Sequence, residues 1–247
     1  MSEEPLWKRH RKQLDALYDL EPNFDLDRTH QYTEENGWNI DEYEAELPSE
    51  PSGAPIPGGP WEIAKRIIHD YKFPPPEIIT GIYYPDRPLE ERVILLQAKF
   101  LLFTFYFGVR IGGVIDERRE TEKGPAQIWG FCYQTLEGHF EQGQMNFEVW
   151  KWLETGKIAF RIYAFSRTNE ITNPFYRLGF KLFGRPLQKR FARRALERMQ
   201  TFVKEELEAK IRRAPPPQED APTVQLASAK QETEEKLKEA KEQAISR

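Results

Sequence analysis

The spacing of apolar residues divides the chain into a short helical start, a block of strands and a long helical end. Residues 5–20 carry an apolar stripe at helical spacing, which predicts a helix docked outside the core. Residues 37–47 predict an edge strand, and the Pro- and Gly-rich residues 48–60 predict a linker. Residues 61–72 repeat apolar side chains every three or four positions, which predicts a second helix that ends at Pro74.

Between residues 78 and 166 the alternation has a period of two, which predicts seven strands. They are Ile78–Tyr83, Val93–Phe100, Leu102–Phe107, Val109–Glu117, Ile128–Gln134, Met145–Trp152 and Ile158–Ser166. The short turns between them favour an antiparallel meander. The stretch Val93–Ile115 has the length of a membrane span, but Gln97, Lys99 and Arg110 interrupt it, so strands are the better interpretation.

From Pro174 onward the apolar residues return to helical spacing. We expect the long part of this helix to begin at Pro186, with Gly179 and Gly184 interrupting its lead-in. Residues 213–247 predict a disordered linker followed by a charged helical tail. The order of elements therefore predicts an α+β fold with an antiparallel sheet and a long C-terminal helix.

Composition then limits the classes of function. The chain has 247 residues with 13% aromatics, and its mean hydropathy is −0.72, so a core is flanked by polar segments. The single cysteine, Cys132, excludes an intrachain disulfide and a multi-cysteine zinc site. No apolar leader opens the sequence, so we expect an intracellular, cytoplasmic location.

Charge is distributed unevenly along the chain. Residues 1–59 hold 5 basic and 14 acidic side chains, whereas residues 174–212 hold 11 basic and 4 acidic ones. The basic helix could dock on a membrane surface or a partner. Because the acidic segment could also neutralise it within the chain, we favour that internal explanation and expect no nucleic acid to bind.

Several strings resemble the DUF1990 family. The strings are LPSEPSGAPIPGGPWEIAKRIIHDYKF, PLEERVILLQAKF, VRIGGVIDERRE, the run from WGFCYQTLEGHF to RIYAFSR, and NPFYRLGFKLFGRPLQKRFARRALERM. The most specific piece is similar to the family's Y-x-T-L-x-G-H-x-E block and contains Tyr133, Thr135, Leu136, Gly138, His139 and Glu141. The resemblance covers about residues 37–212, which leaves an acidic arm with a helix at 1–36 and the tail at 213–247.

The resemblance implies a START/Bet v 1-like helix-grip fold. In such a fold a curved antiparallel sheet of about 6–7 strands packs against a long C-terminal helix, and a ligand cavity lies between them. The order of elements worked out from periodicity agrees with this arrangement.

His139 and Glu141 are the first candidate site residues. Residues two apart in an extended segment share a face, so the pair could act as general acid and base near neutral pH. The structural alternative is a hairpin whose turn Gly138 permits. A metal site that adds Asp116 or Glu117 is conceivable, but the spacing does not select it, so we expect no metal and no cofactor.

Five further residues complete the candidate ligand-binding set: Tyr133, Thr135, Arg110, Arg161 and Ser166. An arginine inside an apolar strand could pair with a ligand carboxylate or phosphate, or it could point outward. Ser166 lacks the G-x-S-x-G context that exposes a nucleophile, so hydrogen bonding at the end of a strand is its simpler role.

Three functions follow in order of preference. The first is a binding module for a small apolar or amphipathic ligand, with the hairpin of His139 and Glu141 at the mouth of the cavity. The second is a hydrolase or isomerase that uses this pair. The third is docking to a membrane surface or a partner through the basic helix. The oligomeric state does not follow from the sequence.

Overall fold

The computed structural model describes residues 4–100, 103–169 and 174–213. The chain divides into two units, residues 1–208 and 209–247, and the following concerns the first. Seven antiparallel strands form one sheet in the order β1-β7-β6-β5-β4-β3-β2. Their bounds are β1 Asn39–Leu47, β2 Ile79–Ile82, β3 Val93–Phe100, β4 Phe103–Arg119, β5 Ala126–Thr135, β6 Glu141–Trp152 and β7 Ile158–Thr168.

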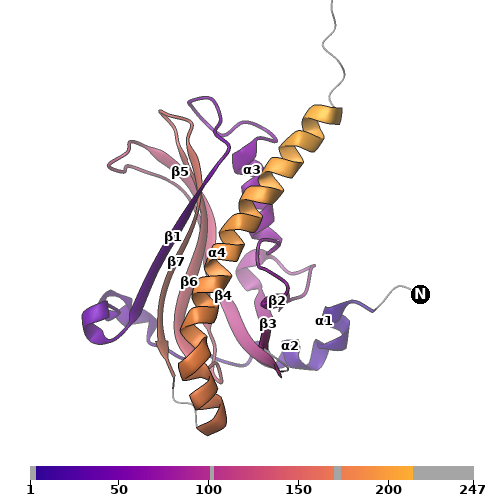
Figure 1. Cartoon of the computed structure of the whole chain (residues 1–247), viewed down its shortest axis with the longest axis vertical. Helices are drawn as coiled ribbons and strands as arrows, with labels where there is room; N and C mark the ends of the chain where they lie inside the picture. Colours follow the sequence, from indigo (N-terminus) through magenta and orange to yellow (C-terminus); the bar gives the residue numbers. More distant parts are fainter. Residues whose placement is uncertain (1–3, 101–102, 170–173, 214–247) are drawn as a thin grey trace, which may run out of the picture. The chain divides into compact units, whose positions relative to one another are not determined.

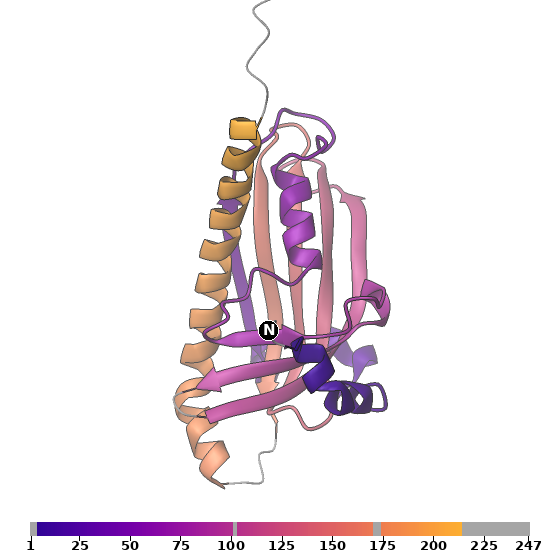
Figure 2. The same cartoon turned by 90° about the vertical axis from the view of Figure 1, so that its right-hand side faces the viewer.

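The helices α3 and α4 lie on the concave face of this curved sheet, and α1 and α2 lie on its outer side (Figures 1 and 2). Their bounds are α1 Leu6–Arg9, α2 Arg11–Leu17, α3 Pro60–His69 and α4 Pro174–Arg213. The predicted helix at 5–20 is therefore two short helices that meet at His10. In the described residues no helix is long and apolar enough to cross a membrane.

The strand β4 runs unbroken where the sequence predicts two strands separated at Gly108. Gly108 makes room for another element instead of forming a turn, because a Cβ at this position would lie 2.5 Å from the Cδ2 atom of Leu17 in α2. A register shift between Ile111 and Gly113 marks an irregularity in the pairing of β4 with β5, a feature that bends a strand locally.

The main core fills the concave face. Phe73, Phe131, Phe147 and Phe160 are at most 1% exposed. The side of α4 that faces them carries Phe191, Ala192, Ala195, Met199 and Val203. Among these described residues the protein's own side chains occupy the space between sheet and helix, so the expected ligand cavity is not found along this part of α4.

The helix α4 continues through Pro186, where the sequence predicts a new start after a broken lead-in. Proline removes one intrahelical hydrogen bond. The helix is held on both sides of it, because Arg185 pairs with Asp41 of β1 and Gln188 bonds Glu141 of β6. These tertiary contacts override the local helix-breaking signal.

The acidic N-terminal segment covers the outer face of the sheet. Leu14 and Leu17 pack against Val93 and Leu95, and a second cluster joins Phe24 and Trp38 to Phe165 of β7. In the described part of α4 between residues 185 and 198, Arg185 is the one basic residue paired with an acid from residues 1–59. One acid of this segment, Asp41, thus contacts the basic helix, whereas the residues that precede β1 pack on the opposite face of the sheet.

A buried ion pair fixes the linker that precedes α3. Lys151 Nζ lies 2.6 Å from Glu50 Oε2, and both side chains are 0% exposed. Lys151 also donates to the Ala54 carbonyl, while Glu50 accepts from the backbone N–H groups of Ile56 and Trp61. The Pro- and Gly-rich linker is thus ordered by a charged pair with satisfied hydrogen bonds.

Candidate functional site

The β5–β6 hairpin divides its specific sequence block between the two faces of the sheet, with Tyr133 in the concave core and Leu136 in the outer cluster with Leu14 and Leu17. Gly138 adopts a left-handed φ of 81°, and the His139 N–H donates to the Leu136 carbonyl at 3.1 Å, which closes the turn. The His139 ring lies 4.8 Å from the Phe107 ring, and Phe140 lies 5.0 Å from it. We call Phe105, Phe107, His139 and Phe140 the aromatic rim, and all four side chains are partly buried.

His139 and Glu141 lie together, but their side chains do not form a hydrogen-bonded pair in the structure. The Glu141 backbone N–H donates to His139 Nδ1 at 3.0 Å, so the neutral ring carries its proton on Nε2. Burial lowers the pKa of His139 to about 4. The imidazole is therefore neutral at physiological pH.

The Glu141 carboxyl points to α4, where Gln188 donates to it. Burial raises its pKa to about 7, although the hydrogen bond from Gln188 and the charge of Arg185 oppose the shift. Arg185 forms a bidentate pair with Asp41, with Nη2 3.0 Å from Oδ1. Since that pair is internally neutralised, Glu141 is a carboxyl close to half protonation at neutral pH.

Two buried tyrosines lie further into the core from Glu141. The Tyr133 hydroxyl donates to Met145 Sδ at 3.5 Å, and burial together with the Glu141 charge raises its pKa. Beyond it lies Tyr71, whose pKa burial and the neighbouring Tyr133 also raise. The two phenols interact, but among the described atoms the buried Tyr71 hydroxyl makes no hydrogen bond of normal geometry.

Tyr71 also has an unusual backbone. Its φ is 51°, the one positive φ of a non-glycine residue in the described chain. It occupies the left-handed position after α3, where its N–H bonds Ile68 O and the Lys72 N–H bonds Ile67 O. Glycine normally takes this position. A tyrosine here holds its ring against Phe73 and Phe147 at ring distances of 5.3 and 6.0 Å.

Thr135 and Ser166 lie near the hairpin and hold the chain together. Thr135 Oγ1 donates to Asn23 Oδ1 at 2.6 Å and accepts from the Gly143 N–H at 2.9 Å, which ties the N-terminal segment to β5 and β6. The Ser166 carbonyl accepts from Asn39 at 3.2 Å. Both contacts are structural.

The two arginines of the candidate set lie on the outer face. Arg161 pairs with Glu42 and Glu44 and stacks over Trp150, with Cζ 4.6 Å from the ring centroid. Arg110 donates to the carbonyls of Tyr18 and Leu20 at 3.1 and 2.7 Å. The structure therefore separates both from Tyr133, His139 and Glu141.

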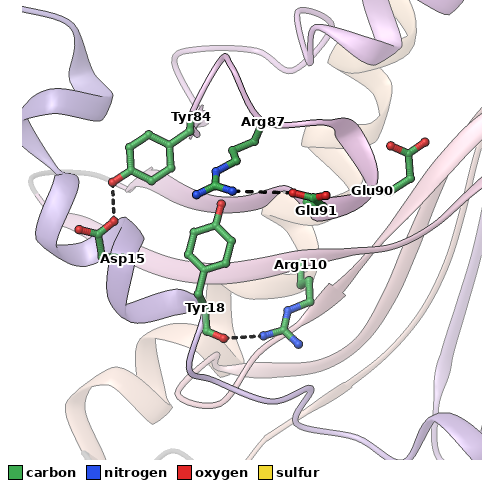
Figure 3. Close-up of a pocket in the computed structure, with 7 residues that line it drawn as sticks. All are labelled: Asp15, Tyr18, Tyr84, Arg87, Glu90, Glu91 and Arg110. Carbon is green, nitrogen blue, oxygen red and sulfur yellow. Dashed lines mark hydrogen bonds and ion pairs between the residues drawn. The ribbon is translucent and has the colours of Figure 1, made fainter.

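Arg110 lines a recess of about 510 Å³ between α2, the loop after β2 and β4 (Figure 3). Its walls carry charges of both signs and two phenols, from Asp15, Tyr18, Tyr84, Arg87, Glu90, Glu91 and Arg110. Tyr84 donates to Asp15 at 2.6 Å, and Arg87 lies 3.8 Å from Glu91. Internal pairs thus occupy most of these polar groups. In the part of the chain that the structure describes, no cluster of three or more acidic, His or Cys side chains is arranged to hold a metal.

Sequence reasoning missed Tyr71, Gln188 and the pair of Asp41 with Arg185. Gln188 had a signal, because it lies three and seven residues before Phe191 and Ala195 and so shares their core-facing side of α4. No signal in the sequence pointed to the role of Tyr71. Its spacing within residues 61–72 indicates only a core position, and glycine is the usual residue at a left-handed position after a helix.

The architecture defines the class of protein: a helix-grip α+β fold, with a curved antiparallel sheet of seven strands and a long C-terminal helix on its concave face. The chain belongs to the family described as "Domain of unknown function (DUF1990)", whose model matches residues 26–198. The match begins inside the predicted arm.

Solved structures of low identity also resemble the chain. A norcoclaurine synthase point mutant from Thalictrum has 10% identity and a TM-score of 0.44, over 69% of this chain and 96% of that one. Ara h 8.0201 has 12% identity and a TM-score of 0.39, over 68% and 99%. A START superfamily protein from Mycobacterium smegmatis has 14% identity and a TM-score of 0.35, over 69% and 98%. No curated protein matches the chain significantly.

Proposed function

We propose that the protein binds a small, neutral, amphipathic molecule where the β5–β6 hairpin meets α4 at Glu141 and Gln188, a place we call the mouth. The polar head of the ligand would contact the line of Glu141, Tyr133 and Tyr71, and its apolar part would lie against the aromatic rim. The observation that carries the proposal is the buried Tyr71 hydroxyl, whose one polar neighbour is the Tyr133 phenol and which makes no hydrogen bond of normal geometry among the described residues.

The buried Tyr71 hydroxyl lowers the stability of the fold. A buried polar group without a partner costs about 1–3 kcal/mol. Phenylalanine would fill the same space without the unpaired oxygen. A ligand oxygen that accepts a hydrogen bond from Tyr71 would explain why a tyrosine stands there.

The neighbouring groups favour a head without a full charge. Arg185 is already paired with Asp41, and burial raises the pKa of Glu141 to about 7. A half-protonated carboxyl can donate to a carbonyl or accept from a hydroxyl. We therefore expect a hydroxyl- or carbonyl-bearing head in place of a phosphate or carboxylate.

The test is a pair of single-atom deletions. Tyr71→Phe should stabilise the empty protein by about 1–2 kcal/mol, because it removes an unsatisfied hydroxyl. Tyr83→Phe is the matched control, since the Tyr83 hydroxyl donates to the Asp70 carbonyl at 2.9 Å and its loss should destabilise by about 1 kcal/mol. Urea unfolding measures both changes.

Binding of the neutral fluorescent amphiphile Nile red completes the test. The proposal expects saturable binding to wild type and to Tyr83→Phe, and binding to Tyr71→Phe weakened about tenfold, as befits one lost hydrogen bond. Equal affinities in all three proteins, or no saturable binding to any of them, would contradict it.

A second candidate function is proton transfer on the bound molecule, and the pKa of Glu141 favours it. A carboxyl with a pKa of about 7 is suited to general acid or base chemistry near neutrality. His139, held neutral, could donate from Nε2 to the same molecule. A hydrolase or isomerase of this kind should lose turnover in Glu141→Gln while retaining ligand, whereas a pure binding module has no turnover to lose.

A further inference from the structure

The outward side of α4 carries a run of basic side chains that the described part of the chain leaves exposed. We call Lys189, Arg190, Arg193 and Arg194 the basic stripe, and all four residues are exposed. At 100° per residue they lie opposite the side that places Phe191 and its apolar neighbours in the core. Within the described chain, Glu197 is the one acid that pairs with the stripe, at 3.0 Å from Arg194.

The stripe is linked to the aromatic rim through the hydrogen bond between Gln188 and Glu141. Gln188 directly precedes Lys189 and bonds Glu141 of β6. Phe140 precedes Glu141 in turn, and its ring lies 5.0 Å from that of Phe107. A short path of contacts thus leads from exposed guanidinium and ammonium groups to partly buried aromatic rings.

We propose that this surface docks on an anionic membrane, with the basic stripe against lipid headgroups and the aromatic rim toward the interface. Clustered Lys and Arg side chains on an amphipathic helix are attracted to anionic lipid. Phe side chains beside such a helix are buried at the boundary between the headgroups and the acyl chains. The positive charge of the stripe complements the anionic headgroups, and the apolar rings of the rim complement the layer below them.

Nucleic acid and acidic protein fit the surface less well. Sequence-tolerant binding of single strands needs a basic groove with stacking rings along it, whereas the stripe lies on the exposed side of α4 and the rings belong to β4 and the β5–β6 hairpin. Within the chain, the acidic residues before β1 belong to a segment that packs on the other face of the sheet, and Asp41 of β1 pairs with Arg185, outside the stripe.

The experiment is vesicle flotation of the full chain, with phosphatidylcholine vesicles that contain or lack phosphatidylserine. The stripe variant is Lys189→Glu with Arg190→Glu and Arg193→Glu. The matched control reverses three exposed basic residues near the other end of β5 and β6, by Arg118→Glu, Lys123→Glu and Lys157→Glu. Both variants change the net charge equally, and circular dichroism checks that both fold.

The wild type and the control should float with phosphatidylserine vesicles, while the stripe variant should partition about 100-fold less. Addition of salt should weaken the binding. An equal loss in both triple variants, no flotation of the wild type at low salt, or binding to RNA or an acidic peptide in place of vesicles would each overturn the proposal. The docking surface does not depend on the proposed ligand, so Tyr71→Phe should float like the wild type.

Discussion

Replacement of Glu141 by glutamine should change how the stability of the protein depends on pH. The pKa of this carboxyl rises from 4.5 in the unfolded chain to about 7 in the fold, chiefly because of burial. The folded state therefore favours the protonated form. The stability that this preference contributes is fully present below pH 4.5 and is lost as the pH rises through 7.

The magnitude follows from the size of the shift. Each pKa unit corresponds to about 1.4 kcal/mol, so the full rise represents about 3 kcal/mol. Glu141 is partly accessible to water, and screening reduces the expected effect to about 1–3 kcal/mol. Glutamine retains the shape and an oxygen that can accept from Gln188, but it cannot ionise.

The assay is thermal unfolding followed by circular dichroism at pH 5 and pH 8. Relative to wild type, Glu141→Gln should gain about 1–3 kcal/mol between the two values, which is about 3–10 °C in Tm for a domain of this size. The lowered pKa of His139, about 4, makes the fold less stable as the pH falls below 6.5. His139 is present in both proteins, so its contribution cancels in the comparison. Because each protein is compared with itself at the two pH values, any effect of the new amide group that does not depend on pH is removed.

Glu137→Gln is the control, because Glu137 is exposed on the same hairpin. Its unfolding should follow the wild type at both pH values. The reasoning about Glu141 is refuted if Glu141→Gln and wild type show the same difference in Tm between pH 5 and pH 8.

Two further predictions concern packing. Lys151→Met should destabilise the fold by about 3–5 kcal/mol in urea unfolding, because it leaves the Glu50 carboxylate buried without its cation; a loss no larger than that of the exposed Lys157→Met would show that the buried pair contributes little. Gly108→Ala should cost about 1–2 kcal/mol, because its Cβ meets Leu17. In a double-mutant cycle Leu17→Ala should be less damaging in that background than in wild type, and additive losses would show that the two sites do not interact.

The period of the apolar pattern predicted the fold class well. Alternation located the strands of the sheet, and helical spacing located α3 and α4. The predictions at Gly108 and Pro186 were wrong, because both residues were interpreted as interruptions. Gly108 instead allows Leu17 to pack closely, and tertiary contacts hold α4 on both sides of Pro186. Local sequence does not contain the contacts of Leu17, Gln188 or Arg185 that decide these cases.

The candidate site was predictable in part. The residues from Tyr133 to Glu141 lie close together, since a hairpin keeps neighbouring residues close, but Leu136 packs on the outer face of the sheet. Arg110 and Arg161 lie on the outer face, and the alternation of β4 and β7 alone did not specify which face was inside. Lys151 was in phase with Phe147 and Val149, so its inward direction was readable, but its partner Glu50 lies 101 residues away.

The central claim, that the mouth beside Tyr71 holds a small neutral amphiphile, is tested most directly by native mass spectrometry of the freshly purified chain. We predict a mass in excess of the polypeptide on the wild type that organic solvent extracts as one class of hydroxyl- or carbonyl-bearing molecule, and a reduced occupancy on Tyr71→Phe. A wild-type spectrum of the bare polypeptide, from which extraction releases nothing, or an occupancy equal in the two proteins would contradict the claim.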